Sequence, residues 1–270
     1  MDVKCYFSNV IFKYSNSDIR TIPIIFKSFG YEIEWFQREG YNKPFSNDCR
    51  YSFVESSVAI VRNVVDIQHL ELSMMKLAWM LSFALNAQVS FYSYRDITNE
   101  IPSCGKQWSV SGVYSASPSP INPAYSQSLV NYLECCWYGF DHVYETRNIP
   151  VIIDYFTQPE AKQLPLEIKL SLSYILLEAL KYSYAVNDGY PFIKGEFKYK
   201  TNLKKDICAR ELIIRMFDSV NLKFDDDLLE ERNFLIHQGI SNKEPRDMHL
   251  LYIKLREAIS EYMLRIFGYK

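Results

Sequence analysis

A proline- and serine-rich stretch divides this chain into two parts with different residue patterns. Residues 115–123 read Ser-Ala-Ser-Pro-Ser-Pro-Ile-Asn-Pro, and proline is poorly tolerated inside regular helices and strands. Apolar residues before this stretch mostly alternate as in strands, whereas those after it recur at helical spacing. The sequence therefore predicts an α+β fold with two domains, residues 1–125 and residues 126–270.

The first part is predicted to be a small α+β domain. Aspartate 66 can cap a helix over residues 66–86, because Leu70, Met74, Leu77 and Leu81 follow it at helical spacing. Segments rich in aromatic and β-branched residues predict strands at 3–14, 22–29, 31–36, 51–65 and 89–94.

The second part is predicted to be an all-α bundle with short connections. Apolar residues recur at helical spacing over about 126–146, 165–186, 201–219, 225–239 and 248–267. Gly239 is expected to end the fourth of these helices. Residues 150–155 are predicted to be extended.

Composition excludes several classes of function. The net charge of −2 gives no overall attraction to nucleic acids, so any such affinity must be local. The six cysteines lack CxxC spacing, and no cluster of histidine, cysteine and carboxylate residues predicts a metal or cofactor site. The most apolar run, 77–85, is far shorter than the ~20 residues of a membrane helix. Together with the absence of an apolar N-terminal segment, these features predict a cytoplasmic protein without membrane contact.

The strongest chemical signal is Arg232-Asn233-Phe-Leu-Ile-His237. On a continuous helix, Arg232 would share one face with Leu228, Leu229 and Leu235, where an apolar residue is expected. A guanidinium there must be paired or must open onto a cleft. His237 is the side chain best suited to move protons near neutral pH.

The spacing alone is not specific. Arg62 and His69 form a similar pair, but Arg62 falls in a predicted strand and His69 in the helix that follows. These two side chains share no helical element, so we interpret this second match as a coincidence.

Lysine residues cluster before the motif. They alternate with Phe197 and Tyr199, which is typical either of a solvated loop or of a surface that follows an RNA backbone. The candidates for RNA binding are Lys198, Lys200, Lys204 and Lys205.

The context of Arg232 to His237 resembles the HEPN superfamily (higher eukaryotes and prokaryotes nucleotide-binding domain). Its Arg-Asn-x-x-x-His form, followed closely by Gly239, is similar to the Apea-like branch. Glu178 on an earlier predicted helix resembles the acidic residue of that family, and is expected to pair with Arg232. The resemblance covers about residues 126–270.

The resemblance implies a metal-independent endoribonuclease that acts as a homodimer with a composite active site. His237 would be the general acid and base, Arg232 would hold the phosphate and stabilise the transition state, and Asn233 would position His237 or the phosphate. A host-defence or toxin-type role and regulation by residues 1–125 or by a protein partner would follow by analogy. The alternative is a non-catalytic module that binds RNA or a nucleotide.

Overall fold

The computed structural model describes residues 1–10, 23–37, 55–97, 102–103, 119–122, 126–160, 164–239, 241 and 243–269. Two compact units emerge, Met1–Asp141 with Glu160–Lys162 and Tyr269, and His142–Pro159 with Gln163–Gly268 and Lys270. The expected boundary at residue 125 precedes helix α2 (Ser126–Tyr144), most of which belongs to the first unit. Each unit is described by itself.

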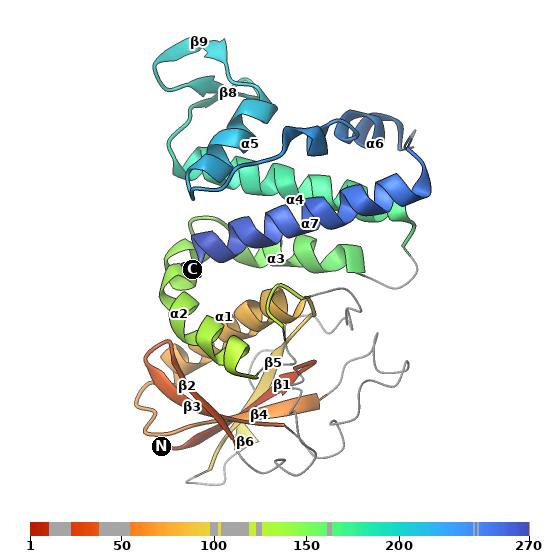
Figure 1. The fold of residues 1–270 in the computed structure, drawn as a ribbon. Helices are drawn as coiled ribbons and strands as arrows, with labels where there is room; N and C mark the ends of the chain where they lie inside the picture. Colours follow the sequence, from red (N-terminus) through yellow and green to blue (C-terminus); the bar gives the residue numbers. More distant parts are fainter. Residues whose placement is uncertain are drawn as a thin grey trace. The chain divides into compact units, whose positions relative to one another are not determined.

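The first unit contains a six-stranded antiparallel sheet (Figure 1). Its spatial order is β2-β3-β4-β1-β5-β6, so the first strand of the chain lies inside the sheet between two later ones. The strands are β1 (Val3–Ser8), β2 (Ile24–Ser28), β3 (Tyr31–Gln37), β4 (Glu55–Val61), β5 (Phe91–Asp96) and β6 (Pro102–Ser103). Residues 11–14 and 51–54, which we predicted to be strand, lie outside the described residues.

One face of the sheet builds the core of this unit. Val3, Cys5 and Phe7 alternate along β1 and are fully buried, because successive side chains of a strand point to opposite faces. The Phe7 ring lies 4.5 Å from that of Trp35 on β3. Burial strongly raises the pKa of the Cys5 thiol, so this cysteine is an inert core residue.

Helix α1 (Ile67–Leu85) begins as the sequence predicts. The Asp66 carboxylate accepts hydrogen bonds from the backbone N–H groups of Gln68 and His69, at 2.8 and 3.2 Å. These bonds satisfy donors that a helix start leaves open, so Asp66 is confirmed as the N-cap.

The second unit is built around helices α4 (Leu166–Asn187) and α7 (Pro245–Ile266). Helix α4 contacts α3 (Ile149–Thr157), α5 (Ala209–Asp218), α6 (Arg232–Gln238) and α7. The extended segment predicted over residues 150–155 is wrong, because Pro150 occupies the first turn of α3, where its missing N–H costs nothing.

The prediction of an all-α second domain is also wrong. A three-stranded antiparallel sheet, β7 (Phe192–Ile193), β8 (Glu196–Tyr199) and β9 (Asn202–Asp206), lies between α4 and α5 in the sequence. Lys194 and Gly195 both have positive φ, of 54° and 86°, which suits a two-residue hairpin turn. The helix predicted from residue 201 therefore begins only at Ala209.

The helix predicted over residues 225–239 is divided in two. A 3₁₀ helix, η3 (Asp226–Leu229), is followed by a turn, and α6 begins at Arg232. Gly239 ends α6 with a φ of 72°, which confirms the expected glycine cap. Arg232 is consequently the first residue of a short helix, not a member of a long apolar stripe.

None of the described helices combines the length and the apolar composition that crossing a bilayer requires.

Candidate functional site

Arg232 is held by an acidic residue on the central helix α4. Its Nη2 atom lies 2.8 Å from Oε1 of Glu178, so the pair that the sequence led us to expect is present. Nη1 of Arg232 donates a 3.0 Å hydrogen bond to Oδ1 of Asn233. The guanidinium is thus oriented from two sides, by α4 and by its own helix.

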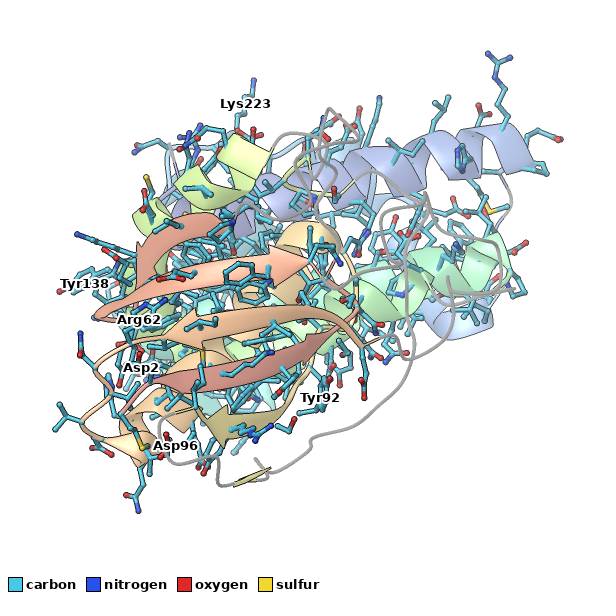
Figure 2. All side chains as sticks on the ribbon, turned by 90° about the horizontal axis from the view of Figure 1, so that it is seen from below. Asp2, Arg62, Tyr92, Asp96, Tyr138 and Lys223 are labelled. Atoms are coloured by element: carbon cyan, nitrogen blue, oxygen red, sulfur yellow. The ribbon has the colours of Figure 1, made fainter. Side chains whose placement is uncertain are left out.

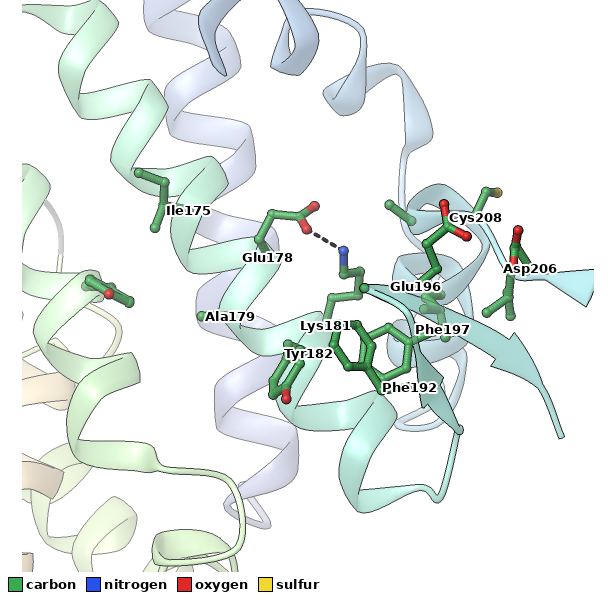
Figure 3. Close-up of a pocket in the computed structure, with 15 residues that line it drawn as sticks. Ile175, Glu178, Ala179, Lys181, Tyr182, Phe192, Glu196, Phe197, Asp206 and Cys208 are labelled. Carbon is green, nitrogen blue, oxygen red and sulfur yellow. Dashed lines mark hydrogen bonds and ion pairs between the residues drawn. The ribbon is translucent and has the colours of Figure 1, made fainter. Parts of the chain in front are cut away.

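The ion pair belongs to a chain of three charges. Glu178 uses its other oxygen, Oε2, to bind Nζ of Lys181, one turn further along α4 (Figure 3). Side-chain exposure is 23% for Arg232, 29% for Glu178 and 12% for Lys181. Because these groups are largely withdrawn from water, salt screens them less than it would a surface pair. Together, these three side chains carry one net positive charge.

One donor of the guanidinium is unsatisfied among the described residues. The Nε atom of Arg232 is buried, and no described residue accepts a hydrogen bond from it. A buried donor without a partner is costly, so the pairing of Arg232 in this arrangement is incomplete.

Arg232 and Asn233 line a cavity of about 410 Å³ between α5, η3 and α6. The N-terminal end of α5 contributes Cys208, Ala209 and Arg210, and this helix begins without a side-chain cap. Backbone N–H groups at such an end favour anions. The cavity therefore combines an incompletely paired guanidinium with a helix N-terminus.

Carboxylates in the same cavity oppose an anion. Asp226, Asp227 and Glu230 also line it. Asp226 is paired with Arg210, whose Nε donates a 2.7 Å hydrogen bond to Oδ2 of Asp226. That hydrogen bond lowers the pKa of Asp226. Glu230 lies 3.8 Å from Nζ of Lys243, so two of the three carboxylates are partly neutralised.

His237 lies in the last turn of α6. Five residues of helix place its backbone ~7.5 Å along the axis from that of Arg232. Its side chain is outside the described part of the structure. The structure thus brings together Arg232, Asn233 and Glu178, and it places His237 on the same short helix by its backbone.

A second cavity, of about 720 Å³, is lined by two members of the same group of charges (Figure 3). Glu178 and Lys181 of α4 line it together with residues of the β7–β9 sheet and the start of α5. Its aromatic wall consists of Tyr182, Phe192 and Phe197. Cys208 and Ala209 line both cavities, so the two adjoin at the start of α5.

The candidate RNA-binding lysines lie on or beside the β8–β9 hairpin, but two of them are already paired. Lys198 binds Asp206, which raises the pKa of the lysine, and Lys200 lies 2.6 Å from Asp188. Lys205 lies over the ring of Tyr199, 4.9 Å from its centroid, and Lys204 is exposed. The positive charge that this surface offers to RNA is therefore smaller than the number of its lysines suggests.

The second arginine–histidine match has separate partners. Arg62 lies beside Asp2 at the sheet (Figure 2), 3.2 Å from its carboxylate, and also pairs with Glu34 at 2.8 Å. His69 contacts the hydroxyl of Tyr31 through its Nδ1 atom, at 2.8 Å. The interpretation of this match as a coincidence agrees with these contacts.

Sequence reasoning missed two residues of the site. Lys181 follows Glu178 by three positions on a helix, a spacing at which opposite charges pair and which was visible in the sequence. Tyr174 of α4 donates a buried 2.8 Å hydrogen bond to the carbonyl of Leu228 in η3. No sequence pattern indicates that bond, because it joins residues 54 positions apart.

One group of carboxylates in the described residues has the spacing of a possible metal site. Asp225, Asp226 and Asp227 place oxygen atoms within 4.8 Å of one another. Asp226 is engaged by Arg210, and Asp225 accepts from the backbone N–H of Asp227 as the cap of η3. These contacts account for two of the three carboxylates without an ion.

Comparisons with protein-family models, with curated proteins and with solved structures gave no match for this chain. The functional interpretation therefore depends on the residues of the site and on their geometry.

Proposed function

We propose that this protein is a metal-independent endoribonuclease of the HEPN type. The observation that carries the proposal is the ion pair between Arg232 and Glu178. This pair fixes an incompletely paired guanidinium on a residue that lines a cavity and begins the short helix that also contains His237. Arginine is well suited to hold phosphate oxygens, because its planar donors match their geometry.

In the proposed reaction the ribose 2′-hydroxyl attacks the adjacent phosphorus. His237 accepts the proton of the 2′-hydroxyl, a new bond forms from the 2′-oxygen to phosphorus, and the bond from phosphorus to the 5′-oxygen breaks. A second histidine gives a proton to the departing 5′-oxygen. The products are a 2′,3′-cyclic phosphate and a 5′-hydroxyl, and Arg232 stabilises the charge on the non-bridging oxygens.

A homodimer would supply the second histidine. Two copies related by a two-fold axis present the same helix to one another, so the two His237 residues can flank one phosphate. Helix α6 leaves Phe234 and Ile236 40% and 39% exposed, beside Arg232 and His237. Exposed apolar side chains next to a site favour a protein interface there.

The decisive experiment compares single substitutions on single-stranded RNA in the presence of EDTA. We expect His237→Ala and Arg232→Ala each to reduce cleavage at least ~100-fold. The first removes the general acid–base group, and the second removes the cation that stabilises the charge of the transition state. The matched controls are Arg62→Ala and His69→Ala, which alter the second arginine–histidine pair. Cleavage that persists in the first two variants would show that the activity has another origin.

A non-catalytic RNA- or nucleotide-binding module is the second candidate. It is favoured by the pairing of Arg232 on two sides, because a guanidinium that is already paired has less charge left to stabilise a transition state. RNA binding without cleavage, unchanged in His237→Ala, would select this alternative.

A further inference from the structure

The larger cavity presents a wall of three aromatic rings. Tyr182 comes from α4, Phe192 from β7 and Phe197 from β8. The ring of Phe192 lies 4.8 Å from that of Phe197 and 5.7 Å from that of Tyr182. Phe197 is buried, but Phe192 and Tyr182 are 50% and 49% exposed. Two rings of a packed cluster are therefore open to a ligand.

The polar groups of this cavity are mainly hydrogen-bond acceptors. Glu196 and Asp206 line it and are 61% and 52% exposed. Each of them binds Lys198, and the two carboxyl groups also interact with each other. A carboxylate can accept about four hydrogen bonds, so both keep the capacity to accept another. Lys181 is engaged by Glu178. These carboxylates disfavour an anion and favour a flat, uncharged group that carries N–H donors.

The cavity continues toward Arg232. Glu178 lines the cavity with its carboxylate and also binds Arg232, and both cavities share Cys208 and Ala209. A ligand that occupies both would place a flat ring among the aromatic residues and a negative group at the guanidinium. A nucleotide has this division between a base and a phosphate.

We propose that the larger cavity binds a nucleobase with an exocyclic amine, such as adenine or cytosine, from the RNA whose phosphate lies at Arg232. The planes of Phe192 and Tyr182 are 81° apart, so the base stacks on one of these rings and contacts the edge of the other. Its amine donates to Glu196 or Asp206. The volume of about 720 Å³ lies within the range of ~300–1,000 Å³ usual for small-ligand sites. This inference rests on the proposed function, and it adds a preference for amine-bearing bases to it.

Binding can be measured without cleavage by using 2′-O-methyl RNA, which has no free 2′-hydroxyl to attack the phosphate. The probes are fluorescent oligoadenylate and oligouridylate of equal length, titrated with the full-length chain at one fixed salt concentration. Fixed salt is needed because lysine contacts to the backbone depend strongly on it. Fluorescence anisotropy reports the dissociation constants.

We expect oligoadenylate to bind more tightly than oligouridylate, since uracil has no exocyclic amine. Phe192→Ala and Tyr182→Ala should each weaken oligoadenylate binding about tenfold, which is within the effect of removing one stacking ring. Leu203→Ala is the matched control, because Leu203 is 56% exposed on the same sheet and does not line the cavity. Tyr182 lies on a helix, so its variant remains informative if Phe192→Ala disturbs the short strand β7.

Three results would overturn the inference: equal affinity for the two oligonucleotides, no detectable binding of either, or wild-type affinity in both aromatic variants. Its failure is separable from that of the proposed function. If only the inference fails, Arg232→Ala abolishes cleavage while Phe192→Ala changes neither binding nor cleavage. If only the ribonuclease proposal fails, the base preference remains although no RNA is cut.

Discussion

The carboxylate of Glu178 both compensates and orients the guanidinium of Arg232. Burial of a guanidinium is unfavourable unless an opposite charge accompanies it. Glu178 provides that charge and holds the guanidinium of Arg232, a residue that lines the smaller cavity. Glu178 also binds Lys181, so a change at this residue affects two cations.

Glu178→Gln should therefore destabilise the protein by about 1–2 kcal/mol, because both cations lose their charged partner in a partly buried site. Urea denaturation measures this difference. The double variant Glu178→Gln/Arg232→Gln should lose less than the sum of the two single losses, since the second change removes a charge left without its partner. Additive losses would mean that the pair does not contribute to stability.

A second residue-scale prediction concerns Tyr174. Tyr174→Phe removes a buried hydrogen bond to the carbonyl of Leu228 and should lower the free energy of unfolding by about 1 kcal/mol. Tyr182→Phe is the control on the same helix, because that side chain is 49% exposed. Equal stability of the two variants would exclude a role for the Tyr174 hydroxyl in holding η3.

At the scale of elements, the short β7–β9 sheet distinguishes the second unit from the all-α bundle that the sequence predicted. The turn of its first hairpin consists of Lys194 and Gly195, and its strands supply Phe192 and Phe197 to the larger cavity. The geometry of this turn consequently determines the shape of the aromatic wall.

Gly195→Ala should weaken that hairpin by about 1 kcal/mol, because alanine is strained at a φ of 86°. Amide hydrogen exchange of β7 and β8 should accelerate roughly fivefold, the equivalent of that free energy. Lys194→Gly is the opposite control: a glycine relieves the positive φ of 54° and should leave exchange unchanged or slower. No acceleration in Gly195→Ala would mean that the turn does not limit the hairpin.

Helices were predicted well where an apolar period extends over many residues, as in α1, α4 and α7. The antiparallel strand pair β2–β3 around Gly30 was also predicted. Prediction failed over residues 192–206, where strands are short and depend on a turn with positive φ, and over residues 225–239, where a helical period continues across a break. Periodicity detects an apolar face, but it does not detect an interruption of the backbone hydrogen bonds.

For the candidate site, the pairing of Glu178 with Arg232 was expected for two reasons. Arg232 fell in a predicted apolar stripe, and Glu178 resembles the acidic residue of the HEPN superfamily. The cavities were not predicted, since they form between elements that are distant in sequence. The roles of Arg232, Asn233 and His237 in RNA cleavage stay predictions.

At the scale of the whole molecule, acid should destabilise the second unit. Three of its carboxylates have lowered pKa values: Asp206 through a hydrogen bond from Lys198, Glu211 through the Tyr199 hydroxyl and Asp226 through Arg210. A carboxylate with a lowered pKa binds fewer protons in the folded state. Its stabilisation is present above its ordinary pKa and is lost as the pH falls through the folded value.

We therefore expect the urea midpoint to fall as the pH drops below 4.5, the ordinary pKa of Glu211. Burial raises the pKa of Asp154, so protonation of this one residue favours the folded state as the pH falls. The three carboxylates with lowered pKa values outnumber it. Glu211→Gln should reduce the dependence on pH between about pH 5 and about pH 3. A midpoint that is constant over this range, or equal slopes in the variant and the wild type, would contradict the prediction.

Helix α6 has only seven residues, about half the length that an isolated helix needs to persist in water. Its conformation must therefore be imposed by α4 and η3, which it contacts. Arg232 and His237 can keep a common geometry only while those contacts last. Local opening of this segment would separate the two residues before the long helices unfold. Heating or mild denaturant should therefore abolish the proposed RNA cleavage at a lower temperature or denaturant concentration than it abolishes helical structure.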